Sequence, residues 1–166
     1  MSGSSAGAQG SGASAAPRFF CDAMLGRLAR WLRALGFDTA YEADIADAEL
    51  AARAAVEGRL VLTRDRRLAE EQGVEDVLVI VAEQPVAQLR EVFTRLALAV
   101  PDRLFTRCTV CNTVVEPLPA GEARARVPPN VLARQTDFTR CPTCGRIYWE
   151  GGHAHRMRNR LMDAFR

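Results

Sequence analysis

The sequence predicts an α/β fold in which a parallel sheet is flanked by helices and followed by a small second unit. Between residues 18 and 100, short apolar stretches alternate with amphipathic ones, which is the pattern of strands alternating with helices. Two of the apolar stretches, Leu60–Leu62 and Val77–Val81, are unbroken, as expected for strands covered on both faces. After Pro101, proline becomes frequent and cysteines appear in pairs, which indicates a change of architecture.

The composition is that of an ordinary folded protein. The chain has 166 residues, of which 48% are hydrophobic and 25% charged, so we expect one domain with or without a small appendage. No apolar run approaches the roughly 20 residues that cross a bilayer, and we expect no membrane partner. Residues 1–17 are rich in Gly, Ser and Ala and are predicted to be a disordered tail. Because this tail lacks the features of an export signal, the expected location is the cytoplasm.

Local patterns place each element of the α/β domain, residues 18–100, and of the second unit, residues 101–166. The first helix is expected over residues 23–35, with Gly36 as its stop and one apolar arc made of Met24, Leu25, Leu28, Trp31, Leu32 and Leu35. A strand at 18–21 precedes this helix. After it we expect a strand at 39–41, a helix at 48–57 capped by Asp47, a strand at 60–63, a short helix at 66–72, a strand at 77–81 and a helix at 85–100. The second unit is expected to end in a helix at 153–165.

Four of the five cysteines form two CxxC pairs, Cys108–Cys111 and Cys141–Cys144, separated by 29 residues. A tetrahedral zinc ion takes four thiolates, and each CxxC turn supplies two of them from neighbouring positions. Too few apolar residues surround the pairs to build an independent core, so this segment needs a metal ion or another cross-link to stabilise it. We therefore predict structural zinc. A redox pair or disulfides are the alternatives, and the proline-rich, turn-rich setting disfavours a redox motif. Cys21 is predicted to be a buried, inert thiol.

Two acidic residues, Asp22 and Asp65, each follow a predicted strand. The carboxyl ends of parallel strands form the ligand-binding edge of an open α/β sheet, and carboxylates there can share Mg²⁺ or Mn²⁺. Asp44, in the loop after the second strand, is the candidate third ligand. Alternatively, Asp22 caps a helix and Asp65 is a turn residue, since acids are common at helix starts. The pattern alone leaves both interpretations open.

The basic residues are 22 arginines and no lysine. Residues 17–100 carry 11 Arg against 14 acids, a net charge of −3, whereas residues 101–166 carry 11 Arg against 6 acids, a net charge of +5. An acidic body with a basic tail unit fits a metal site beside a surface that meets a polyanion. The arginines expected to contact nucleic-acid phosphates are Arg27, Arg30, Arg33 and Arg64. A solvated helix face is the alternative for the first three.

Three motifs together resemble one known family. The segment DAMLGRLARWLRALG, residues 22–36, resembles the opening of the Mut-seven C-terminal RNase domain. LTRD, residues 62–65, resembles its second signature, and RCPTCGRIYWEG, residues 140–151, resembles its zinc-ribbon ending. The resemblance spans residues 18–158. It implies a PIN-like parallel sheet between helices with an acidic, metal-dependent site, joined to a zinc ribbon.

By motif, Asp22 and Asp65 match the family's acids after the first strand and in the second signature. The middle acid falls within residues 42–47, where we choose Asp44. PIN nucleases usually carry a fourth acid. The candidates after Asp65 are Asp76 and Glu83, and neither is convincingly placed. This departure leaves open whether one or two metal ions bind.

The hypothesis is a metal-dependent endoribonuclease. Asp22, Asp44 and Asp65 would hold Mg²⁺ or Mn²⁺, a metal-activated water would hydrolyse the RNA phosphodiester bond, and the zinc ribbon would assist RNA binding. The main alternative is a non-catalytic RNA- or ribosome-binding adaptor whose acids are helix caps. A zinc-stabilised protein-interaction module is the third possibility, and it predicts no RNA binding.

Overall fold

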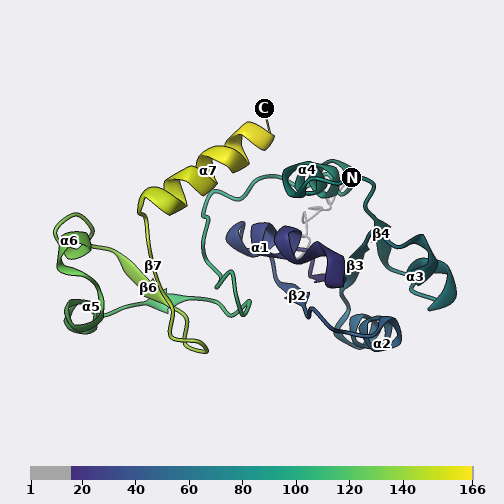
Figure 1. The fold of residues 1–166 in the computed structure, drawn as a ribbon, viewed down its shortest axis with the longest axis horizontal. Helices are drawn as coiled ribbons and strands as arrows, with labels where there is room; N and C mark the ends of the chain where they lie inside the picture. The colour runs from purple at the N-terminus through teal and green to yellow at the C-terminus, as the bar shows by residue number, and fades with distance from the viewer. Residues whose placement is uncertain (1–15, 166) are drawn as a thin grey trace, which may run out of the picture.

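The computed structural model of the protein describes residues 16–165 and contains two sheets (Figure 1). The predicted tail, residues 1–17, lies almost entirely outside the described residues. The elements are β1 (Phe19–Cys21), the 3-10 turn η1 (Ala23–Leu25), α1 (Gly26–Ala34), β2 (Thr39–Tyr41), α2 (Asp47–Glu57), β3 (Leu60–Thr63), α3 (Arg66–Glu71), β4 (Val77–Val79), α4 (Pro85–Arg95), β5 (Glu116–Pro117), α5 (Ala120–Arg126), α6 (Pro129–Leu132), β6 (Phe138–Arg140), β7 (Ile147–Trp149) and α7 (Gly152–Ala164). No helix among the described residues has the length and apolar character needed to cross a membrane.

The first sheet has four parallel strands in the order β2-β1-β3-β4. This confirms the α/β prediction. Cys21, the last residue of β1, pairs with Tyr41 on one side and with Leu62 on the other. The chain therefore leaves β1, β2 and β3 at the same edge of the sheet, and the last residues of these three strands differ by at most one position in the strand pairing. This shared edge is what brings distant parts of the sequence together.

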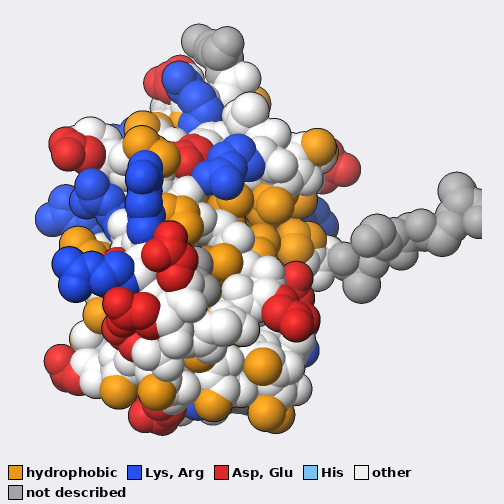
Figure 2. Space-filling model, turned by 90° about the vertical axis from the view of Figure 1, so that its right-hand side faces the viewer, with side chains coloured by type: hydrophobic (Ala, Val, Ile, Leu, Met, Phe, Trp, Pro, Cys, Tyr) orange, Lys and Arg blue, Asp and Glu red, His pale blue; other side chains and the backbone are white. Residues whose placement is uncertain are grey.

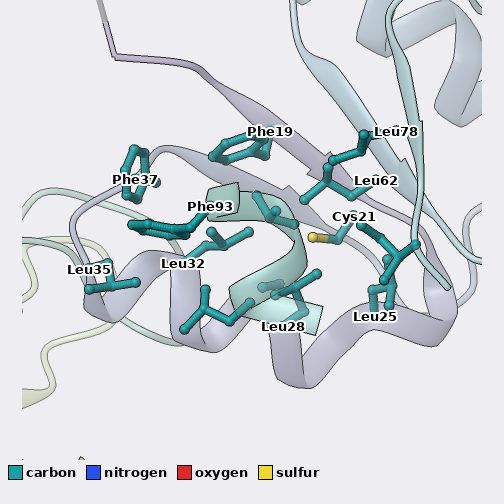
Figure 3. Packing of buried hydrophobic residues seen from close by; sticks show 14 of the residues in the cluster. Phe19, Cys21, Leu25, Leu28, Leu32, Leu35, Phe37, Leu62, Leu78 and Phe93 are labelled. Carbon is teal, nitrogen blue, oxygen red and sulfur yellow. The ribbon is translucent and has the colours of Figure 1, made fainter. Parts of the chain in front are cut away.

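Alternation along the strands separates two hydrophobic cores. Phe19, Cys21 and Leu62 face a core completed by α1 and α4, whereas Phe20 and Val61 face a core completed by α2 and α3. The helices therefore cover both faces of the sheet. In the first core, the rings of Phe19 and Phe37 are 5.7 Å apart and those of Phe37 and Phe93 are 5.6 Å apart (Figure 3). Such aromatic contacts add to the free energy gained by apolar burial.

The start of the first helix differs from its prediction. The Asp22 carboxylate caps the 3-10 turn η1, and the α-helix begins only at Gly26. As a result Met24 leaves the apolar arc and is 68% exposed. The helix predicted at 85–100 also ends earlier, at Arg95, and Ala97 just after it has a φ of 50°. The predicted cap Asp47 instead lies in the first turn of α2, with Ala46 at the cap position.

The second unit folds around the antiparallel sheet β5-β6-β7. A third cluster, which includes Leu118 and Phe138, lies under α5 and α6. The C-terminal helix then returns to α4, and Leu161 and Met157 of α7 join the first core (Figure 1). The proposed boundary at residues 100/101 therefore separates two sheets, whereas the largest hydrophobic core spans both units.

Asp38 ties the two units together at the amino end of β2. Its carboxylate accepts hydrogen bonds from Arg59 Nη1 at 2.6 Å and from the side-chain amide of Asn112 at 2.8 Å. Arg59 is only 8% exposed, so its charge depends on this partner and on Glu57, whose carboxylate lies 2.5 Å from Arg59 Nε. Burial alone would raise the pKa of Asp38, but the bonds from Arg59 and Asn112 outweigh burial and lower the pKa to about 2.

We expect Asp38→Asn to lower the free energy of unfolding at pH 7 by about 2 kcal/mol, since a depressed carboxyl pKa is stabilising above its unfolded value. This contribution is lost as the pH falls from about 4 toward 2, so wild type and variant should converge in acid. Urea unfolding at pH 7 and at pH 3 measures the difference. Asp102→Asn, at an exposed position, is the matched control. A difference that persists unchanged at pH 3 would contradict the assignment.

Candidate functional site

The four paired cysteines form a single cluster. Their Sγ atoms all lie within 4.8 Å of one another, with Cys108 to Cys144 at 3.7 Å and Cys111 to Cys141 at 3.2 Å. Sulfur ligands on a tetrahedral zinc ion at ~2.3 Å are about 3.8 Å apart, so the cluster fits zinc. All five cysteines are free, which excludes disulfides in this structure. Structural zinc is therefore the chemistry that this donor set supports.

The two CxxC turns have matching backbones. The carbonyl of Cys108 accepts from the amide of Asn112, and the carbonyl of Cys141 accepts from the amide of Gly145. Asn112 and Gly145 occupy the same left-handed conformation, with φ of 68° and 70°. The sequence points to Gly145, as glycine adopts this conformation freely. Asn112 is the equivalent residue of the other turn, and asparagine is the residue that most often replaces glycine there.

The surroundings of the cluster shift the pKa values of Cys108 and Cys111 in opposite directions. Burial would raise the pKa of Cys108, but the Tyr148 hydroxyl at 3.0 Å and the amides of Cys111 and Val110 lower it to about 6. Burial and the hydrogen bonds with Cys141 and Cys108 raise the pKa of Cys111 to about 11. A zinc ion that takes all four sulfurs as thiolates must therefore displace protons from the cluster.

Arg33 does not belong to a nucleic-acid surface, and the prediction that it contacts RNA is wrong. It is 5% exposed, and its guanidinium donates to the carbonyls of Thr39 at 2.9 Å and Val110 at 2.6 Å. A third, longer bond of 3.3 Å reaches the carbonyl of Thr109. The charged end of α1 is thus buried against the first CxxC turn, which explains why an arginine there faces inward.

Asp22 lies at the carboxyl edge of the parallel sheet, as predicted. Its carboxylate is 6% exposed and accepts three hydrogen bonds: from the amide of Met24 at 2.9 Å, from the amide of Arg64 at 3.1 Å and from the hydroxyl of Thr63. It therefore caps η1 and at the same time joins the ends of β1 and β3.

Asp65 is linked to Asp22 through Thr63. The Thr63 hydroxyl donates to Asp22 and accepts from the backbone amide of Asp65 at 2.9 Å. The exposed Asp65 carboxylate accepts from the amide of Arg67 at 2.8 Å and caps α3. The structure thus brings two of the three predicted acids to one edge through one shared hydroxyl. Thr63 is a site residue that sequence reasoning missed.

Asp44 lies in the exposed turn that follows β2. The register of β1 and β2 places Glu42, rather than Asp44, at the position adjacent to Asp22. Glu42 is held by an ion pair with Arg53 of α2. Within the described part of the chain, the four cysteines are the one place where three or more potential metal ligands lie close together. The carboxylates at the sheet edge do not form a comparable cluster.

A groove of about 570 Å³ lies beside these acids, between the first turns of α1 and α4. Three of the four predicted RNA-contacting arginines, Arg27, Arg30 and Arg64, line it. Glu83 is the acidic residue in its wall, at 3.9 Å from Arg64. Basic side chains gather on part of the face that carries α3 and β4, with acidic side chains beside them (Figure 2). The groove is therefore a cationic surface next to two carboxylates.

Gly26 and Tyr41 shape one wall of this groove. A Cβ atom on Gly26 would lie 2.7 Å from the Tyr41 ring, so only glycine leaves room for this packing. The Tyr41 hydroxyl in turn donates to the carbonyl of Ala23 at 3.2 Å. The contact fixes the end of β2 against the start of α1, which is the reason for a glycine at the first position of the helix.

The fold and the sites define a protein with two parts. A parallel α/β domain, whose sheet edge carries acidic and basic residues, is joined to a unit whose four clustered cysteines have the geometry of a zinc site; we call it the zinc-binding unit. A family model described as the Mut7-C RNAse domain matches residues 17–161. The chain belongs to this family, which supports a ribonuclease-type function with RNA as the substrate. Comparisons with curated proteins and with solved structures gave no match.

We expect the purified protein to contain one zinc ion per chain and Cys141→Ser to lose most of it, because three thiolates bind zinc less tightly than four. Metal analysis of the purified proteins measures this. Cys21→Ala is the matched control, since Cys21 is buried in β1 and its pKa is raised by burial. A Cys141→Ser protein with a full equivalent of zinc would contradict the assignment.

Proposed function

We propose that the protein is a metal-dependent endoribonuclease whose active site is the carboxyl edge of the parallel sheet. The observation that carries the proposal is the hydrogen-bonded chain Asp22–Thr63–Asp65 beside the groove lined by arginines. Carboxylates at the ends of neighbouring parallel strands occupy the position where α/β sheets bind ligands. The family assignment supports RNA as the ligand.

The donor set is suited to a hard cation, because it offers carboxylate oxygens. Asp22 and Asp65 would hold Mg²⁺ or Mn²⁺ with water in the remaining positions, and Asp44 in the turn after β2 would be the third ligand. When bound, the ion would neutralise charge on the phosphate and lower the pKa of a coordinated water. Because the carboxylates are not gathered as the cysteines are, we propose a single ion of modest affinity.

The chain's own residues would bind and orient the RNA. Arg27, Arg30 and Arg64 line the groove, where guanidinium groups can donate paired hydrogen bonds to phosphate oxygens. The first turns of α1 and α4 also lie there, and the partial positive charge of a helix N-terminus favours phosphate. A reducing compartment such as the cytoplasm would keep the four thiols available for zinc.

The second candidate function is a non-catalytic RNA-binding adaptor. The observation that favours it is that both acids already have structural roles: the Asp22 carboxylate accepts three hydrogen bonds, and Asp65 caps α3. An adaptor would bind RNA through the same arginines without a divalent ion. The two functions therefore differ in whether Mn²⁺ leads to cleavage.

We expect Asp65→Asn to reduce Mn²⁺-dependent cleavage of single-stranded RNA at least 100-fold. Asparagine keeps the cap of α3 and removes the charge that binds the metal, so the variant should unfold at the same denaturant concentration. Asp76→Asn is the matched control, since this exposed residue lies at the amino end of β4, across the sheet. Full activity in Asp65→Asn would contradict the nuclease mechanism. RNA binding without cleavage by the wild type would favour the adaptor function.

We expect Arg27→Ala and Arg64→Ala each to weaken RNA binding and to make it less sensitive to salt. For single-stranded nucleic acid, each lost phosphate contact reduces the slope of log K against log salt by about 0.7. Binding of a fluorescent oligonucleotide at several salt concentrations, without divalent ions, measures both effects. Arg134→Ala, an exposed arginine of the second unit outside the groove, is the control. Unchanged slopes in the groove variants would remove these arginines from the RNA surface.

A further inference from the structure

A second cavity, of about 500 Å³, lies in the zinc-binding unit, away from the sheet edge described above. Its walls come from the segment before the first CxxC turn, from the hairpin of β6 and β7, and from the first turns of α7. The lining is largely apolar and includes three aromatic residues: Phe105, Tyr148 and Trp149. Two carboxylates, Asp137 and Glu150, also line it.

Local contacts hold the three aromatic residues in place. Phe105 has a φ of 59°, which is strained for a bulky residue, and its amide donates to the carbonyl of Ala34 at 2.7 Å. The Tyr148 hydroxyl is tied to Cys108 Sγ at 3.0 Å. The Trp149 indole lies against Gly151, with Nε1 2.7 Å from the position of a Cβ there, and its ring is 6.2 Å from that of Phe138. The cavity is therefore preorganised, which lowers the entropic cost of binding a flat ligand.

The two carboxylates lie at the same end of the hairpin. Phe138 of β6 pairs with Trp149 of β7. Asp137 precedes Phe138 and Glu150 follows Trp149, so the two acids are neighbours across the antiparallel strands. Like charges at such positions are unfavourable. Arg158 offsets this by pairing with Glu150, whereas Asp137 contacts the neutral Thr136 hydroxyl at 3.4 Å. An acidic group beside aromatic walls suits a flat ligand that presents hydrogen-bond donors.

We propose that this cavity binds one unstacked guanine base of a single-stranded RNA. The proposal rests on RNA being the substrate class proposed above. Guanine presents two adjacent donors, N1–H and the N2 amino group, on its Watson–Crick edge, and a carboxylate such as that of Asp137 accepts both. Adenine presents one donor group at that edge and uracil one, so each pairs less completely. Unpaired bases stack on aromatic side chains in this kind of recognition.

The charge around the cavity allows the phosphates to lie outside it. Arg156 Nη1 lies 3.4 Å from the position that a Cβ on Gly152 would occupy, so a guanidinium lies at the first turn of α7, next to Gly152 of the cavity wall. Residues 101–166 carry 11 arginines against 6 acids. A largely apolar cavity with two exposed carboxylates at its edge, in a basic unit, matches a nucleotide whose base is inserted and whose phosphates remain in solvent.

The experiment follows the fluorescence of Trp149 in the full chain. Trp31 is the other tryptophan, so Trp31→Phe leaves one emitter. The trinucleotides UGU and UAU are titrated without Mg²⁺ or Mn²⁺, so that no metal-dependent cleavage occurs. We expect UGU to quench Trp149 and to bind about tenfold more tightly than UAU. In the same background, Asp137→Asn should abolish this preference and retain binding.

A second test variant and a control complete the experiment. Trp149→Ala should weaken UGU binding about tenfold in a competition assay with a labelled oligonucleotide. Val114→Ala, an exposed apolar residue of the same unit outside the cavity, should have no effect. Zinc content and circular dichroism show whether each variant is folded. If Trp149→Ala does not fold, Asp137→Asn still tests the proposal, because Asp137 is at an exposed position.

The outcomes separate this proposal from the nuclease proposal. Equal quenching by UGU and UAU, or a preference that survives Asp137→Asn, overturns the guanine site whatever the cleavage assay shows. Quenching by a trimethyl-lysine peptide but not by UGU also overturns it and identifies the cavity as a cation site. A guanine preference without Mn²⁺-dependent cleavage supports this site while the nuclease mechanism fails.

Discussion

The buried guanidinium of Arg33 is the interaction on which the arrangement of both units depends. A buried charge is costly unless it is paired or hydrogen-bonded, and this one is satisfied by backbone carbonyls of β2 and of the first CxxC turn. The two carbonyls of the turn, Thr109 and Val110, are in place only when the turn has its native shape, which the four-sulfur cluster helps to fix. Zinc binding to the cluster would therefore be coupled to the stability of α1, because loss of the turn would leave the guanidinium without part of its partners.

Helix α1 connects the two sites physically. Its first residues, Gly26 and Arg27, line the groove beside the acids, and its penultimate residue, Arg33, is bound to the zinc-binding unit. Leu28 and Leu32 of its apolar face are fully buried in the first core (Figure 3), and Trp31 packs against that core. Helix α7 adds a second connection, since Leu161 packs into the same core. The zinc-binding unit thus acts as part of the scaffold that positions the sheet edge.

The sequence predicts the features that depend on local spacing, and it misses those that depend on tertiary contacts. The CxxC spacing identifies the four cysteines that cluster, and alternating apolar runs identify the four parallel strands. Arg33 has the same spacing as Arg27 and Arg30, so the helical arc assigns all three to solvent. Its burial is decided by a turn more than 70 residues away in the sequence. Asn112 carries a readable signal, since it follows the first CxxC pair as Gly145 follows the second.

The structural role of Asp22 is compatible with the proposed metal-binding role. Asp22 Oδ2 accepts two hydrogen bonds, whereas Oδ1 accepts the single bond from the amide of Met24. A carboxylate oxygen has two lone pairs, so Oδ1 retains acceptor capacity. Metal-ligating carboxylates are commonly oriented by hydrogen bonds from neighbouring groups. Thr63, by joining Asp22 to Asp65, would then fix the spacing of the two ligands as well as the ends of β1 and β3.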